Sequence, residues 1–342
     1  MKVLITGATG FLGGAIAREA VRRGHQVRVL LRNASKLDGL AGVAFEKAVG
    51  DILDRTSVEA ALVGMQGVIH TAGNVAQRRR DRDAVLAVNI EGTKNVLGAA
   101  RAAGLRAVHT SSMVAIGATE EPVLQTEQSD WTGGGLGYTY AEAKRRAEDH
   151  ARELAAQGLD VVMLCPGMIM GAGDTYLSST RYVLEYLRGR NKFHFGRGGN
   201  SYCHVRDVAN AHVAALEGKG RRGERYIVTG HNSSQEETLE RLWQLTRLHK
   251  PRRMPWPLVL AGAIFSEAVS LLVEHKLEDV NRPLVRYAAR WAFSDCSKAR
   301  RDLGYTVTPF DDALRETITD LIARGHARVQ TPEVAAMVSS VQ

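Results

Sequence analysis

The chain has 342 residues, of which 44% are hydrophobic and 24% are charged. This composition is typical of a globular protein with a large buried core, and it excludes an intrinsically disordered chain. The net charge of +8 at pH 7 suits an anionic ligand or a membrane surface. It does not favour nucleic-acid binding, because the densest basic run, 78–82, is interrupted by Asp81 and followed by Asp83.

The cysteines, the N-terminus and the histidines bear on compartment and metal content. Cys165, Cys203 and Cys296 are far apart and form no CxxC pair, which argues against a disulfide framework or a structural zinc site. Glycine occurs already at position 7, too early for the apolar core of a signal peptide, so we expect a cytoplasmic protein. No metal is expected, because three histidines lack ligand spacing and are interpreted as structural: His70, His204 and His212.

In chain order, the residue pattern predicts short strands that alternate with helices. The strands are expected at 3–6, 27–31, 43–49, 68–71, 107–111, 159–166 and 224–230, and the helices at 13–23, about 84–103 and about 138–157. Strand and helix alternating in this way predict an α/β fold in which helices cover both faces of a parallel sheet.

A glycine-rich loop joins the first strand to the first helix. The segment "VLITGATGFLGGAIA" places Gly7, Gly10 and Gly13 where glycine allows a tight turn, close approach to a pyrophosphate and close packing of helix on strand. This context predicts that a dinucleotide binds at the helix N-terminus. The residues expected to hold it there are Gly7, Thr9, Gly10, Phe11, Leu12 and Gly13.

The end of the second strand bears on the choice of cofactor. A carboxylate for the adenosine ribose is expected about twenty residues after the glycine loop, but "VRVLLRNASK" has Arg32 there, with Lys36 close behind. These cations favour the 2′-phosphate of NADP over the 2′-hydroxyl of NAD. The alternative is that Arg32 simply faces solvent at the end of a strand.

The regular alternation weakens after Gly171. We assign 1–171, with 204–230 returning to it, to a dinucleotide-binding domain, and 172–203 with 231–325 to a smaller substrate-binding lobe. Insertions beyond the carboxyl ends of parallel strands are where α/β proteins build substrate pockets. Residues 326–342 are interpreted as a C-terminal tail.

The segment "YTYAEAK" contains a candidate acid/base pair. Tyr140 lies four residues before Lys144 and shares its helix face, whereas Tyr138 lies six residues before it and does not. A phenol has a pKa near ~10, so a neighbouring cation is needed to stabilise its phenolate at neutral pH. On spacing alone, an ordinary charged surface helix is the alternative.

Taken together and in order, these motifs resemble the extended short-chain dehydrogenase/reductase family over roughly 1–325. The similar segments are "TGATGFLG", "GDILD", "IHTAG", "VNIEGTKNVLGAA", "HTSSMVAIG", "YAEAK", "CPGMIMGAGD", "HVRDVANAH" and "FSDCSKARRDLGY". The resemblance implies a Rossmann-type doubly wound parallel sheet with a smaller, mostly C-terminal, substrate-binding lobe. It also implies a homodimer formed through the helices at 84–103 and 138–157.

The resemblance also implies roles for individual residues. Tyr140 would be the general acid/base, and Lys144 would bind the nicotinamide ribose and lower the tyrosine pKa. Ser112 would hydrogen-bond the reacting oxygen, and Ser111 is the competing assignment. Further cofactor contacts are implied for Asp51 and Ile52 near the adenine, Thr71, Ala72 and Gly73 beside the ribose and pyrophosphate, Asn89 on its helix, and Pro166, Gly167 and Met168 at the nicotinamide. A helix-packing role for Asn89 stays open.

Two branches of this family differ in substrate. Nucleotide-sugar epimerases and dehydratases often have tyrosine where this chain has Ile116 and arginine where it has Cys165. The C-terminal half is similar to the 3β-hydroxysteroid dehydrogenase and dihydroflavonol reductase-like branch instead. This implies NADP(H)-dependent interconversion of a secondary alcohol and a ketone on a bulky apolar substrate, sterol-, polyketide- or flavonoid-like. A nucleotide-sugar enzyme and a non-catalytic cofactor-sensing protein are the alternatives.

An apolar stretch at 257–273 lies in the predicted lobe. We interpret it mainly as a helix that lines the substrate pocket. The apolar groups expected around the substrate are Trp256, Leu258, Phe265, Leu271 and Leu272. Because Lys250, Arg252 and Arg253 precede it, the alternatives are weak peripheral docking on an anionic membrane and a membrane-associated scaffold.

Overall fold

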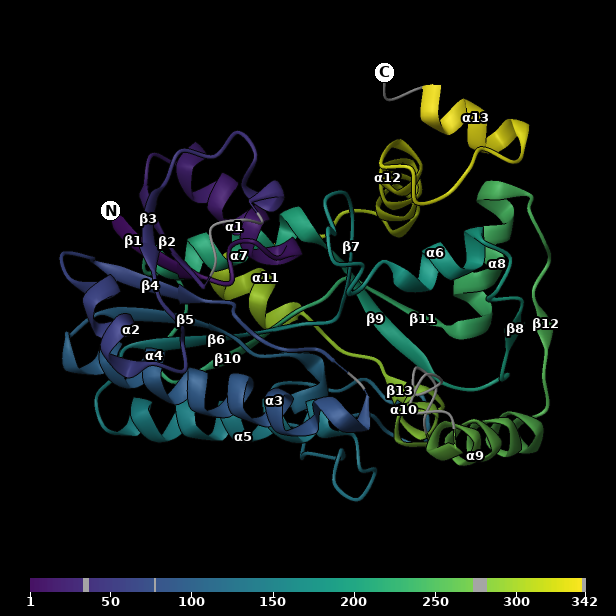
Figure 1. Ribbon diagram of the computed structural model, residues 1–342, viewed down its shortest axis with the longest axis horizontal. Coiled ribbons are helices and arrows are strands. Elements are labelled where there is room, and N and C mark those ends of the chain that lie inside the picture. Colours follow the sequence, from purple (N-terminus) through teal and green to yellow (C-terminus); the bar gives the residue numbers. More distant parts are fainter. Residues whose placement is uncertain (33–36, 77, 273–281, 340–342) are drawn as a thin grey trace.

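A computed structural model describes residues 1–32, 37–76, 78–272 and 282–339 (Figure 1). Within these residues, the main sheet has seven parallel strands in the order β10-β6-β5-β4-β1-β2-β3. The strands are β1 (Lys2–Thr6), β2 (Gln26–Leu31), β3 (Glu46–Val49), β4 (Gly67–His70), β5 (Arg106–Thr110), β6 (Val161–Pro166) and β10 (Arg225–Val228). The predicted parallel sheet is therefore confirmed.

Helices cover both faces of this sheet, as predicted (Figure 1). One face carries α1 (Phe11–Arg22), α7 (Val205–Leu216) and α11 (Ser297–Leu303). The other carries α2 (Arg55–Leu62), α4 (Gly92–Ala102) and α5 (Thr139–Ala156). The architecture is the Rossmann-like α/β fold that the glycine loop and the alternating pattern indicate.

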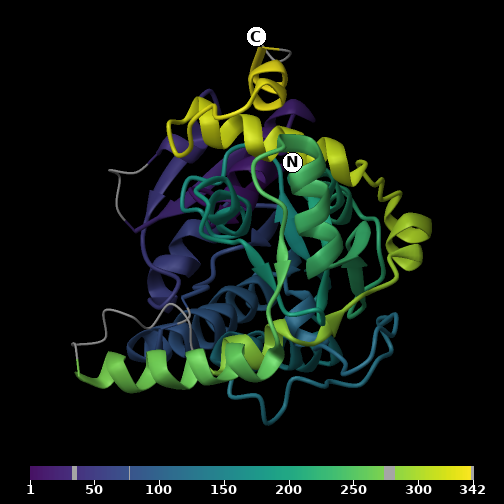
Figure 2. The same ribbon diagram turned by 90° about the vertical axis from the view of Figure 1, so that its right-hand side faces the viewer.

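Beyond the carboxyl ends of the strands, a second part of the molecule is built on a small sheet. Its strands are β7 (Met168–Met170), β9 (Gly199–His204), β11 (His231–Ser234) and β13 (Trp291–Ala292). A separate cluster of apolar side chains joins α6 (Arg181–Leu187), α8 (Gln235–Thr246), α12 (Phe310–Ala323) and α13 (Pro332–Ser339). Figure 2 shows α12 and α13, in yellow, at the opposite end of the molecule from the green helix α9 (Trp256–Leu272).

The remaining short elements connect these parts. Strand β8 (Phe193–His194) pairs in parallel with β12 (Arg252–Arg253), which leads into α9. Helix α9 packs on α10 (Arg282–Ala288). In the part of the chain that the structure describes, no helix combines the length and the apolar content required to cross a membrane.

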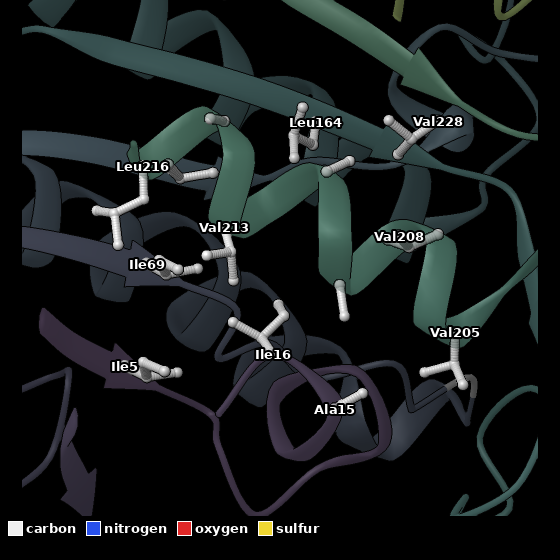
Figure 3. Close-up of a cluster of buried hydrophobic side chains, with 14 of the residues drawn as sticks. Ile5, Ala15, Ile16, Ile69, Leu164, Val205, Val208, Val213, Leu216 and Val228 are labelled. Atoms are coloured by element: carbon white, nitrogen blue, oxygen red, sulfur yellow. The ribbon is translucent and has the colours of Figure 1, made fainter. Parts of the chain in front are cut away.

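The core between α7, α1 and the sheet explains why these elements form (Figure 3). Val213 and Leu216 of α7 point toward Ile69 of β4, and Ile16 of α1 fills the space beside them. All four side chains are at most 1% exposed. Full burial of such a side chain contributes roughly 1.5–3 kcal/mol to the free energy of folding. This layer therefore fixes α1 on the sheet and holds the glycine loop at the carboxyl end of β1.

Three segments differ from the sequence-based expectations. The helix predicted at 84–103 is interrupted: α3 (Arg82–Leu86) is followed by a π-helical turn, Ala87–Glu91, before α4 begins. Helix α11 lies in the range assigned to the lobe, but Ala299 and Leu303 pack into the core of the main sheet. The expected C-terminal tail contains α13, because Val334 and Met337 provide an apolar side that is buried against α8 and α12.

Candidate active site

The glycine loop closes tightly on itself and on the end of β4. Gly7 has φ +74°, and a Cβ there would lie 2.6 Å from the backbone nitrogen of Ala72. A Cβ at Gly13 would collide with the carbonyl oxygen of Gly7. Gly10 is the N-cap of α1, whose first turn presents free backbone N–H groups and the positive end of the helix dipole. This narrow cradle fits a dinucleotide pyrophosphate. Phe11 is buried, and Thr9 and Leu12 are partly exposed at the same loop.

Arg32 lies at the same edge of the sheet as the glycine loop. Thr6, the last residue of β1, pairs with Leu30 of β2, and Arg32 comes directly after β2 ends at Leu31. Its side chain is exposed. This position is compatible with a 2′-phosphate contact and equally with the solvent-facing alternative. Lys36 lies outside the described residues.

Asp51 and Ile52 follow β3 at this edge and are both fixed by local contacts. The carboxylate of Asp51 accepts a hydrogen bond of 2.9 Å from the backbone N–H of Leu53. The carbonyl of Ile52 accepts a 2.9 Å bond from the Asn95 side chain, and the Ile52 side chain is 93% buried beneath α4 and thus not open to a ligand. Of these two residues, the part-exposed Asp51 is therefore the more accessible to an adenine.

The segment after β4 links the cofactor cradle to Lys144. The Thr71 hydroxyl donates a 2.7 Å bond to the carbonyl of Thr6. A Cβ at Gly73 would lie 2.9 Å from Asn89 Oδ1 and 3.7 Å from Lys144 Nζ. A side chain at Gly73 would therefore crowd Asn89 and the lysine ammonium, and glycine leaves that space free.

Asn89 lies in the π-helical turn and secures that segment. Its Nδ2 donates two hydrogen bonds of 2.8 Å, to the carbonyls of Asn74 and Val85. Its side chain is almost completely buried. These contacts support the packing role that the sequence left open, because Asn89 holds the loop at 73–76 against its helix.

Tyr140, Ser112 and Lys144 come together at the carboxyl end of β5. Tyr140 is in the first turn of α5 and hydrogen-bonds Ser112, which caps a short 3₁₀ turn, Met113–Ala115. Lys144 lies one turn further along α5, and its Nζ donates a 2.8 Å hydrogen bond to the carbonyl of Thr110. Lys144 is buried, whereas Tyr140 and Ser112 are partly exposed. The two hydroxyls can therefore reach a substrate while the ammonium stays behind them.

The pKa of Tyr140 is higher than expected from its neighbour Lys144. Burial raises the pKa of Tyr140 to about 12, and the hydrogen bond with Ser112 offsets this only in part. Burial also lowers the pKa of Lys144 to about 8. The expected lowering of the tyrosine pKa by Lys144 is not found in this structure, because the ammonium is directed at Thr110. At pH 7 the phenol keeps its proton and the lysine its charge.

The neighbouring Ser111 faces away from Tyr140, as strand alternation predicts. Its hydroxyl donates a 2.5 Å hydrogen bond to Oε2 of Glu148. Glu148 is completely buried and also accepts from Arg225 at 3.1 Å and Arg152 at 2.9 Å. This network is not among the features expected from the sequence, although one pattern indicates it. Tyr140, Lys144 and Glu148 are spaced four residues apart, so Glu148 shares the helix face of the catalytic pair, which points into the protein.

The turn after β6 is held by the second sheet. Pro166 ends β6 and is buried, and Met168 begins β7, where it pairs with Tyr202 of β9. A Cβ at Gly167 would collide with the carbonyl of Ser201. Gly167 and Met168 are partly exposed beside the site, so this turn can form one wall of a nicotinamide pocket.

Helix α10 covers the site from the other part of the molecule. The ring of Tyr138 lies 6.1 Å from that of Tyr140 and 5.0 Å from that of Tyr287 on α10. Burial raises the pKa of Tyr287 well above its usual value, and Tyr140 contributes to the shift. Leu136 and Leu284 belong to the same apolar cluster. The sequence analysis did not single out Tyr287, because nothing local marks which lobe residue meets Tyr140.

Other residues expected near the substrate lie elsewhere. Leu258 and Phe265 are 63% and 70% exposed, so neither encloses a pocket in this structure. The Trp256 ring packs under the Arg197 guanidinium at 5.4 Å. The side chains of Leu271 and Leu272 are outside the described ones. Among the described side chains of α9, Leu258 and Phe265 therefore do not line a pocket as expected.

The histidines interpreted as structural are engaged with neighbours. His70 lies between the hydroxyls of Thr6, at 2.7 Å, and Thr93, at 3.1 Å. His212 Nε2 lies 2.9 Å from the hydroxyl of Thr110, and burial lowers its pKa to about 4. His204 lies 3.2 Å from Glu316. Each ring has a polar neighbour that accounts for its position.

Known proteins resemble the chain along most of its length. A sequence model of the "NAD dependent epimerase/dehydratase family" matches residues 3–229. Sterol demethylase protein B of Methylococcus capsulatus is 33% identical over 331 residues, 95% of this chain and 99% of that protein. The 4-hydroxy-2-methyl-3-oxo-4-farnesyl-3,4-dihydroquinoline-1-oxide ketoreductase of Stigmatella aurantiaca is 28% identical over 312 residues, 89% of this chain and 92% of that protein. Among solved structures, the crystal structure of a nucleoside-diphosphate-sugar epimerase from Pseudomonas aeruginosa superposes with a TM-score of 0.76 and is 26% identical in sequence. The match covers 96% of this chain and 99% of the epimerase chain.

Proposed function

Because the chain belongs to the NAD-dependent epimerase/dehydratase family of extended short-chain dehydrogenases/reductases, we propose that it interconverts a secondary alcohol and a ketone. The proposed substrate is bulky and mostly apolar, and the proposed cofactor is NADP(H). The observation that carries the proposal is the hydrogen-bonded pair of Tyr140 and Ser112, with Lys144 behind them and Gly73 open beside the lysine. In this proposal Tyr140 exchanges a proton with a substrate oxygen, and Ser112 holds that oxygen.

The mechanism assigns separate tasks to these side chains. A bound nicotinamide would supply or accept the hydride at the carbinol carbon. In the reductive direction, Tyr140 donates its phenol proton to the ketone oxygen. Ser112 donates a second hydrogen bond to that oxygen, which stabilises the negative charge that develops there. In this structure the Lys144 ammonium donates to the Thr110 carbonyl, so its proposed task is to hold the nicotinamide ribose from behind the two hydroxyls.

Apolar groups around Tyr140 support an apolar substrate. Leu136, Tyr138 and Tyr287 are buried in one cluster against which Tyr140 and Leu284 pack. Ile116 and Cys165, which distinguish the sequence from those of nucleotide-sugar enzymes, do not support an apolar substrate directly. Both are completely buried and cannot touch a substrate. Sterol demethylase protein B and the farnesyl-quinoline ketoreductase, by their names, act on large apolar molecules. Similarity to them along most of the chain favours the same substrate class here.

Nucleotide-sugar epimerisation is the second candidate function. The structural similarity to a nucleoside-diphosphate-sugar epimerase favours it. A diphosphate needs cations that face the pocket, and the candidates for this task are Arg206 on α7 and Arg197 in the lobe. Arg206 is paired with Glu316 at 2.7 Å, and Arg197 is stacked on Trp256 and bonded to the carbonyl of Ala289. Both cations are therefore already engaged.

A substrate panel separates the two functions. Purified protein is supplied with NADPH or NADH and with steroid, polyketide-like and flavonoid-like ketones, and cofactor oxidation is followed by absorbance. UDP- and dTDP-sugars are tested in parallel for binding by calorimetry and for epimerised products. We expect reduction of at least one ketone class with NADPH and no turnover of sugars. Turnover of a nucleotide sugar with every ketone refused would establish the epimerase function instead.

A further inference from the structure

The first half of helix α9 presents apolar side chains that the described part of the chain leaves exposed. Leu258, Ile264 and Phe265 are 63%, 48% and 70% exposed, and Ala261 and Gly262 are exposed between them. At 3.6 residues per turn, Leu258, Ala261, Gly262 and Phe265 fall within about 100° of one another on one side of the helix, and Ile264 lies at the margin of that side. Exposed apolar residues are ordinary when single, but a continuous apolar side marks an interaction surface.

The position of α9 leaves this side accessible. The helix lies along the lower edge of the molecule in Figure 1 and extends outward in the turned view of Figure 2. Helix α10 is the element on which it packs. The exposed side chains consequently project away from the protein.

Positive charge borders the apolar side. Arg252 and Arg253 form β12, immediately before α9, and both are exposed. Lys250 is exposed just before them, and Lys192 is exposed just before β8, the partner strand. In the described part of the chain, no carboxylate lies within ion-pair distance of Arg252 or Arg253. Phe193, 43% exposed, adds an apolar group to this strand pair.

We propose that α9 and the β8–β12 pair dock on an anionic lipid bilayer. The apolar side of α9 would insert among the acyl chains at the interface, with the helix lying in the plane of the membrane, while the four cations contact anionic headgroups. A second copy of the chain could also cover Leu258 and Phe265. Exposed cations beside an apolar side match the anionic headgroups that border the acyl chains, so the charge pattern favours the bilayer.

Docking would place the candidate active site near the membrane. Helix α10 lies between α9 and Tyr138, and its Tyr287 is 5.0 Å from the Tyr138 ring. An apolar substrate could then enter from the bilayer past α10. This consequence rests on the proposed function, whereas membrane binding itself does not.

Co-sedimentation with vesicles tests the proposal without any substrate. The full chain is mixed with vesicles of phosphatidylcholine alone or with added phosphatidylglycerol, at low and at high salt. We expect binding to the anionic vesicles that salt weakens. Leu258→Ser with Phe265→Ser should reduce binding at least tenfold. Arg252→Gln with Arg253→Gln should reduce it about fivefold per arginine, on anionic vesicles only.

Matched controls use equally exposed residues far from α9. Val63, 71% exposed, and Arg301, with a 69% exposed side chain, serve as Val63→Ser and Arg301→Gln, and neither should change binding. The proposal is wrong if the protein does not bind anionic vesicles at low salt, or if the α9 variants bind as the controls do. It is also wrong if sedimentation velocity finds a dimer that Leu258→Ser with Phe265→Ser converts to a monomer while vesicles stay unbound.

Discussion

Replacing Glu148 by glutamine should destabilise the protein strongly, although the side chain never touches a substrate. Glu148 is completely buried, and its main partner Arg225 has a side chain only 6% exposed, 3.1 Å away. Glutamine keeps the shape but removes the charge, and leaves the buried guanidinium without an anion. Breaking a buried pair by removing one partner typically costs about 3–5 kcal/mol in the free energy of unfolding.

The second arginine bound to Glu148 provides a control. Arg152 lies 2.9 Å from the Glu148 carboxylate, but its side chain is 41% exposed, so water screens the ion pair between Arg152 and Glu148. Arg152→Gln should therefore cost less than about 1 kcal/mol. Arg225 also donates hydrogen bonds to the carbonyls of Glu127 and Ser129. Arg225→Met should therefore also loosen the loop that precedes α5, the helix that carries Tyr140.

Urea unfolding followed by circular dichroism measures these differences as shifts in the midpoint at constant slope. The double variant Glu148→Gln with Arg225→Met should lose less unfolding free energy than the two single variants lose together. Each single variant already removes the interaction between the two side chains, so the second substitution cannot remove it again. A loss below about 1 kcal/mol for Glu148→Gln, or strict additivity in the double variant, would show that the pair does not stabilise the fold as described.

Three further predictions concern the cofactor and the lysine. Arg32→Asp should shift preference from NADPH toward NADH by more than tenfold, or about 1.4 kcal/mol in relative affinity, whereas a wild-type preference for NADH would refute this role. Gly13→Ala should abolish nucleotide binding in a calorimetric titration, since its Cβ would collide with the Gly7 carbonyl, and undiminished affinity would contradict the tight-loop geometry. With its pKa lowered to about 8, Lys144 loses its charge as pH rises through that value, so kcat/KM for ketone reduction should fall above about pH 8. Lys144→Arg, whose pKa exceeds about 12, should abolish that fall in a pH profile.

Local sequence signals were enough to predict the parallel sheet, and the resemblance to a known family added the candidate site residues. The strand at 3–6, the glycine loop and the first helix are specified by neighbouring residues, and the spacing of Tyr140 and Lys144 is specified by one helix. Tyr140 lies close to Ser112 because β5 ends, and α5 begins, at the same edge of the sheet.

The remaining features depend on distant partners, which spacing does not reveal. A glutamate in a charged helix reads as exposed, and only Arg225 on β10 explains why Glu148 is buried. Tyr287 reaches the site because α10 folds back over Tyr138. The π-helical turn at Asn89 depends on hydrogen bonds to another loop. The very short strands β8 and β12 exist only because they pair with each other.

The proton-donor role of Tyr140 is the central claim, and single-turnover kinetics tests it most directly. Enzyme saturated with NADPH is mixed with an accepted ketone, and oxidation of the cofactor is followed in wild type, Tyr140→Phe and Tyr138→Phe, with cofactor affinity measured separately. Loss of a positioned acid typically lowers the rate about 10²–10⁴-fold. We predict a loss of this size for Tyr140→Phe with unchanged affinity for NADPH, and most of the wild-type rate for Tyr138→Phe. A Tyr140→Phe enzyme that keeps more than about a tenth of the rate would contradict the role assigned to Tyr140.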